Sequence, residues 1–148
     1  MMYNDASEFP FLKQTNRNNC GLTCLKMIIN YYKIKGDDKK LFLFPKPETP
    51  VSFERLIYFA RQLNFTCLPV KVDLQELTAH TPLPCLIHWK KKHFVIVYKI
   101  NDGRISIADP AVGLLTYSAD EFKLKFYEED HSKGNCLILL PGDFTPGN

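Results

Sequence analysis

The sequence predicts an α+β domain in which helices near the N-terminus pack on an antiparallel sheet formed by the rest of the chain. Up to about residue 64 the apolar residues recur with the period of a helix, and beyond it they alternate as in half-buried strands. The 148 residues contain no repeat and no break in composition. We therefore place one domain at residues 1–148, with a core at about 9–141 and the start of a linker at 142–148.

The first predicted element is a buried central helix over residues 20–33. Its apolar side chains form two stripes, so the helix is apolar nearly all round and belongs inside the domain. We expect Asn18 or Asn19 to cap it and Gly36 to mark its end. Residues 37–50 hold three prolines and are predicted to be a loop, and a second helix follows Ser52 and stops at Asn64.

Strands dominate the remainder of the chain. A short helical turn at 73–78 and a helix that contains Phe122 and is capped by Ser118 interrupt them. The predicted strands are 65–72, 83–89, 93–100, 104–108, 114–117 and 135–140.

Composition excludes several classes of protein. Charged residues make up 24% of the chain and the net charge is +3. The densest basic run is Lys90, Lys91 and Lys92, which is too short to indicate nucleic-acid binding.

Residues 1–10 have no signal-peptide pattern, and no apolar run is long enough to span a bilayer. Five cysteines without the spacing of a disulfide scaffold favour free thiols in a reducing compartment. We expect a soluble, cytosolic chain.

Cys20 is the first candidate for chemistry, because it lies where the central helix begins. The backbone amides of a first helical turn favour a thiolate, and the Cys20 amide can donate to an oxyanion. Gln14, six residues upstream across a short loop, can supply a second oxyanion donor. Position alone leaves open that Cys20 is a small core residue, as free cysteines usually are.

His93 and Asp109 lie on two strands joined by a predicted hairpin. A three-residue loop, Asn101 to Gly103, would place Val95 opposite Asp109 and bring His93 and Asp109 to one face as diagonal neighbours. A two-residue loop would place them on opposite faces. If they meet, the carboxylate orients the imidazole, and with Cys20 and Gln14 the set has the order of a cysteine peptidase site.

Each of these residues also has a structural interpretation. His93 alone could be a strand-edge histidine, and Asp109 could be a turn former before Pro110. A zinc site can be drawn from Cys20, Cys24, His88 and His93, but no Cys-x-x-Cys pair supports it. We interpret the other cysteines as packing residues, namely Cys24, Cys67, Cys85 and Cys136. The loop histidines His80 and His131 have no evident partner in the sequence.

From Phe11 to Leu140 the chain resembles a known family, the bacterial peptidases that remove double-glycine leaders from bacteriocins and related peptides. These are usually the N-terminal domains of peptidase-containing ABC transporters. The resemblance is carried by several segments together: Gln14, Asn19–Leu25, Met27–Ile28, Tyr31–Tyr32, Pro84–Trp89, His93–Val97, Asp109–Gly113 and Glu121–Phe122.

The resemblance implies a papain-like fold with Cys20 as nucleophile, His93 as general base, Asp109 as its orienting partner and Gln14 as oxyanion donor, without metal or cofactor. Asn19 departs from the aspartate that commonly precedes the nucleophile, so the local electrostatics differ there.

The partners it implies are a leader peptide with a Gly-Gly cleavage site and an amphipathic helix, and the membrane and nucleotide-binding domains of the same transporter. The domain would then lie on the cytoplasmic side of the bacterial inner membrane, and no nucleic acid is expected.

Two other functions remain open at this point. A module that only holds leader peptides would not need Cys20 or His93, and their presence argues against it. A stand-alone cysteine hydrolase or transferase could use the same fold, and transmembrane helices and a nucleotide-binding motif after Asn148 would exclude it.

Overall fold

The computed structural model describes residues 2–3, 8–16, 18–32, 51–90, 93–127 and 132–142. These ranges contain four helices, which are α1 (Cys20–Tyr32), α3 (Phe53–Gln62), α4 (Leu74–His80) and α5 (Ala119–Phe126). The strands are β1 (Met2–Tyr3), β2 (Phe65–Val72), β3 (Cys85–Trp89), β4 (His93–Asn101), β5 (Arg104–Asp109), β6 (Gly113–Ser118) and β7 (Gly134–Pro141).

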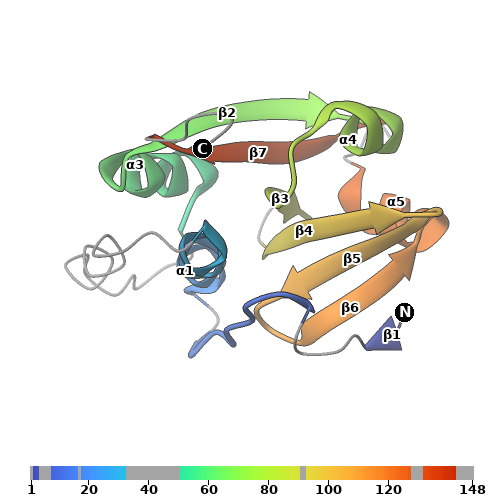
Figure 1. Ribbon diagram of the computed structural model, residues 1–148, viewed down its shortest axis with the longest axis horizontal. Helices are drawn as coiled ribbons and strands as arrows, with labels where there is room; N and C mark the ends of the chain where they lie inside the picture. Colours follow the sequence, from blue (N-terminus) through green and yellow to red (C-terminus); the bar gives the residue numbers. More distant parts are fainter. Residues whose placement is uncertain are drawn as a thin grey trace.

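The strands form one sheet in the order β1-β6-β5-β4-β3-β7-β2. Every strand pair is antiparallel, so the predicted α+β class is confirmed. The sheet twists strongly, and β2 with β7 lies well apart from the β4–β6 part in Figure 1. Strand β1 was not predicted.

Helices cover both faces of the sheet. α1 and α3 share one apolar cluster with sheet residues such as Phe94 and Ile96, whereas α4 and α5 share a second cluster with Val95 and Val97. Figure 1 shows the first pair of helices on the left and the second pair on the right. The predicted packing of the N-terminal helices on the sheet is confirmed, and α4 and α5 add a layer that the sequence analysis did not assign.

α1 is the buried helix that its composition predicts. The backbone amide of Thr23 donates to the Asn19 carbonyl at 2.9 Å, which makes Asn19 the cap residue. The expected helix end near Gly36 and the loop at 37–50 lie outside the described residues. The buried side of α1 comprises Cys20, Gly21, Thr23, Cys24, Leu25, Met27, Ile28 and Ile29.

Most other predicted boundaries agree with the structure. Ser52 caps α3 by accepting from the Arg55 amide at 3.1 Å, and α3 ends before Asn64, whose φ of 67° lies in the left-handed region. β2 has the predicted bounds, and the ends of the other predicted strands lie within two residues of prediction. No helix of the described ranges is long and apolar enough to cross a membrane.

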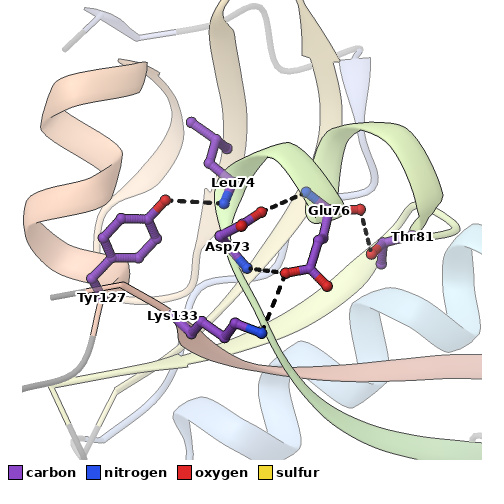
Figure 2. Close-up of polar contacts among 6 residues, drawn as sticks. All are labelled: Asp73, Leu74, Glu76, Thr81, Tyr127 and Lys133. Carbon is purple, nitrogen blue, oxygen red and sulfur yellow. Dashed lines mark hydrogen bonds and ion pairs between the residues drawn. The ribbon is translucent and has the colours of Figure 1, made fainter. Parts of the chain in front are cut away.

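The turn predicted at 73–78 is the start of α4, which a capping box stabilises (Figure 2). The Glu76 amide donates to Asp73 Oδ1 at 2.7 Å, and the Asp73 amide donates to Glu76 Oε1 at 3.3 Å. The Leu74 amide donates to the Tyr127 hydroxyl at 3.1 Å, and Lys133 Nζ lies 3.6 Å from Glu76 Oε1. These contacts connect α4 to the residue after α5 and to the residue before β7, far from α1.

The β4–β5 hairpin corrects one prediction. Asn101 pairs with Arg104, so the loop has two residues, Asp102 and Gly103, with φ of 52° and 73° as a primed turn requires. The predicted three-residue loop is therefore wrong.

A β-bulge compensates for the shorter loop. The pairing shifts by one residue between Val97 and Lys99, which makes Tyr98 the extra residue of the bulge. Beyond the bulge Val97 lies opposite Ile107, which is the register predicted from Val95 opposite Asp109. The bulge therefore restores the register in which His93 and Asp109 can meet.

Candidate active site

Cys20 is the first residue of α1 and is 3% exposed. The thiol faces the start of β4, because its sulfur accepts a hydrogen bond from the Phe94 backbone and interacts with the His93 side chain. The Gly21 amide of the first helical turn also donates to it. The partial positive charge of a helix N-terminus acts at the same place.

His93 and Asp109 meet as the sequence analysis proposed. His93 is the first residue of β4 and Asp109 the last of β5, and His93 Nε2 lies 2.8 Å from Asp109 Oδ1. The same oxygen accepts from the Ala111 amide at 2.9 Å, so the turn after β5 holds the carboxylate in place. The His93 side chain is 29% exposed and that of Asp109 8%, so the pair is largely shielded from water.

These contacts set the protonation of the thiol and the imidazole. Burial raises the pKa of Cys20, but the hydrogen bonds from His93 and the Phe94 amide, the positive charge of His93 and the Gly21 amide outweigh it, and the pKa is lowered. Burial likewise opposes charge on His93, but its hydrogen bonds to Asp109 and Cys20, with their charges, raise its pKa to about 9. Both shifts act in the same direction, toward a thiolate beside an imidazolium.

Cys24, one turn along α1, has the opposite character. It is fully buried, and burial, followed by the negative charges of Cys20 and Asp109, raises its pKa well above the usual value. Its thiol donates to the Phe94 carbonyl, with Sγ 3.4 Å from the oxygen. The surroundings distinguish the two cysteines, because of the two only Cys20 has the His93 imidazole beside it.

Gln14 lies on the segment that leads into α1, beside the residue after Asp109. Its backbone amide donates to the Pro110 carbonyl at 2.8 Å, which attaches this segment to the Asp109 turn. Its side-chain Oε1 is buried and has no hydrogen-bond partner among the described residues. Buried polar groups usually have partners, so Gln14 Oε1 is an exception among the described residues.

Asn19 connects this segment to the nucleophile position. Its Nδ2 donates to Thr15 Oγ1 at 2.7 Å, and its Oδ1 accepts from the Asn16 amide at 3.3 Å. The side chain therefore closes the loop between Gln14 and Cys20 and adds no charge beside the thiol.

The other cysteines and histidines considered in the sequence do not join the Cys20–His93–Asp109 cluster in the described residues. His88 stacks on Phe94 with ring centroids 4.3 Å apart, and within the described ranges no group of three metal-ligating side chains occurs. Cys67, Cys85 and Cys136 are buried free thiols, and His131 lies outside the described residues. The Phe94 backbone is a partner of Cys20 that could not be predicted, because a backbone contact between a helix and a strand leaves no signal in residue types.

Comparison with known proteins adds independent information. The model of the Peptidase C39 family matches residues 8–129. The colicin V secretion/processing ATP-binding protein CvaB of Escherichia coli is 29% identical over 137 residues, which cover 90% of this chain and 18% of the relative. The pediocin PA-1 transport/processing ATP-binding protein PedD of Pediococcus acidilactici is 32% identical over 109 residues, 68% of this chain and 15% of the relative. The chain thus spans less than a fifth of the length of these curated relatives.

Two solved structures share the fold. A double glycine motif protease from an AMS/PCAT transporter, solved with its leader peptide, superposes with a TM-score of 0.76 at 24% identity and covers 90% of this chain and 92% of its own. The peptidase domain of Streptococcus ComA gives a TM-score of 0.74 at 18% identity, with 88% and 96% covered. At this identity the likeness establishes the architecture alone.

Proposed function

Since the chain belongs to the Peptidase C39 family and is a cysteine peptidase domain, we propose that it cleaves the leader from a secreted peptide after a Gly-Gly motif. The observation that carries the proposal is the chain of contacts from Cys20 through His93 to Asp109, with His93 Nε2 2.8 Å from Asp109 Oδ1. The names of the curated relatives, which describe transport and processing, and the leader complex of the solved protease support the choice of substrate.

In the proposed reaction Cys20 is the nucleophile. In the ion-pair state His93 carries its proton, so the thiolate attacks the carbonyl carbon of the second leader glycine directly. The Cys20 amide and the Gln14 side chain donate to the oxyanion that forms, which requires the NH₂ group of Gln14 to face it.

His93 then acts as acid and base in turn. The imidazolium protonates the leaving amine as the C–N bond breaks, and a thioester joins the leader to Cys20. His93 next removes a proton from a water molecule, which hydrolyses the thioester and releases the leader acid. Asp109 holds the ring in the orientation in which Nε2 donates to the carboxylate and the other nitrogen faces the thiol.

Further partners are proposed from the relatives. This domain would lie on the cytoplasmic side of the inner membrane, joined to the membrane and nucleotide-binding domains of one transporter. A module that only holds leaders would not need the Cys20–His93–Asp109 contacts, and a stand-alone hydrolase would not need two glycines in its substrate.

The test is cleavage of a synthetic double-glycine leader peptide, followed by mass spectrometry. We expect the wild-type chain to cut after the second glycine, and Cys20→Ala to fold but not to cut, because the change removes the attacking atom and little volume. Gly→Ala at either glycine should abolish cleavage if the passage is packed around residues without a β-carbon.

Replacing the apolar leader residues upstream of the two glycines with polar ones should weaken binding of the peptide, since a leader helix in an apolar groove supplies the affinity. Undiminished cleavage of both Gly→Ala peptides would indicate a general cysteine hydrolase, and cleavage by Cys20→Ala at the wild-type rate would refute the nucleophile.

A further inference from the structure

The backbone of Phe94 is held firmly between α1 and the sheet. Its ring is 1% exposed, stacks on His88 at 4.3 Å and packs against the α1 backbone, where a Cβ added to Gly21 would lie 3.2 Å from it. In the ladder Phe94 lies opposite His88 of β3. The peptide groups around Phe94 therefore have little freedom to shift along the helix.

Two cysteines of α1 bind opposite ends of this residue. The Phe94 amide donates to the Cys20 sulfur, and the Phe94 carbonyl accepts from the Cys24 thiol at 3.4 Å. The β4–β5 pairs end at Ile96 and Ala108, two residues after Phe94, so the backbone here is outside that ladder. The two cysteines lie four residues apart on α1, so both side chains are on the same side of the helix and can face Phe94.

The thiol of Cys24 suits the role of donor. It is fully buried and its pKa is raised, so it keeps its proton while Cys20 loses one. Without this donor the buried Phe94 carbonyl loses that hydrogen bond, and the start of β4 is held less tightly against α1. That end carries both the Phe94 amide and the His93 imidazole, the two groups on β4 that contact Cys20.

We propose that Cys24 is a positioning residue for the nucleophile, because its thiol holds the Phe94 carbonyl and so keeps the Phe94 amide and the His93 ring aligned on Cys20. The proposal rests on the proposed function, in which Cys20 is the attacking group. It differs from the role of a packing residue, which would affect stability alone.

The experiment compares Cys24→Ala, which removes the donor, with Cys24→Ser, which keeps one. Cys67→Ala is the matched control, because Cys67 is also a buried thiol facing a backbone carbonyl, that of Phe65 at 3.8 Å, away from the site. Cys24→Val, which lacks the donor and fills the volume, replaces Cys24→Ala if that variant does not fold. For each variant the pH dependence of iodoacetamide alkylation at Cys20 is read by peptide mass spectrometry, together with kcat, KM and the melting temperature.

We expect Cys24→Ala to move the alkylation midpoint of Cys20 upward by about half a pH unit to one unit. We expect kcat to fall about two- to tenfold, as for the loss of one hydrogen bond, with KM nearly unchanged. Cys24→Ser should lie closer to the wild type in both readouts. Cys67→Ala should lower the melting temperature without moving the midpoint.

An unchanged midpoint in Cys24→Ala, with a melting temperature lowered as in Cys67→Ala, would overturn the proposal. So would a Cys24→Ser variant that matches Cys24→Ala. The alkylation profile needs no peptide substrate, so it tests the role of Cys24 even where the leader peptide is not cleaved, a result that would refute the proposed function alone.

Discussion

Replacing Asp109 with asparagine should lower the pKa of His93 while leaving the shape of the site intact. The carboxylate oxygen lies 2.8 Å from His93 Nε2, and the pKa of His93, which burial alone would lower, is raised to about 9 by Asp109 and Cys20 together. A neighbouring opposite charge shifts a pKa by about 1–3 units, so the variant should bring His93 down to about 6–8.

The activity should follow this shift. In the wild type the basic limb of kcat/KM should report loss of the His93 proton near pH 9, and the acidic limb should report protonation of Cys20. A shift of about 2 units leaves roughly one tenth of His93 protonated at pH 8 in Asp109→Asn, where the wild type has about nine tenths. The expected loss at pH 8 is therefore about tenfold, and it should shrink as the pH is lowered toward 6.

The assay is the pH profile of leader-peptide cleavage, with Asp102→Asn as the control. Asp102 is an exposed turn residue with φ of 52°, a conformation that asparagine also adopts, so this variant removes the same charge away from the site. Its basic limb should coincide with that of the wild type. A basic limb that stays near pH 9 in Asp109→Asn would refute the argument that this carboxylate sets the protonation of His93.

Three further outcomes are expected. Iodoacetamide should label Cys20 faster than the other four cysteines in the native chain, and equal labelling by peptide mass spectrometry would contradict an activated thiol. Gly134→Ala should destabilise the fold by about 1–3 kcal/mol in urea unfolding, since the added Cβ would collide with the Phe126 carbonyl oxygen; an unchanged midpoint would show that β7 can shift. Because folding raises the pKa of His93, its contribution to stability should be complete below about pH 6.5 and lost as the pH rises through about 9, whereas a His93→Gln variant should lack this loss in the same unfolding series.

Local sequence signals proved sufficient for most elements. Ser52, Asp73 and Ser118 accept from amides three residues on, so each cap could be inferred from a side chain and its nearest neighbours. The position of the proposed nucleophile was equally local, because Cys20 follows the cap residue of a helix that is apolar nearly all round. The four residues proposed for catalysis could thus be named before the structure was known, although their roles remain a proposal.

What the sequence alone determined is the alternation of helix and strand and the four residue types that the chemistry needs, since these depend on side chains close together in the chain. The tertiary structure decided how they meet. The two-residue turn at Asp102 would have separated His93 from Asp109, and only the bulge at Tyr98 brings them together. Register is a property of two strands, and the Phe94 contacts with α1 belong to a helix and a strand packed together, so no single segment encodes them.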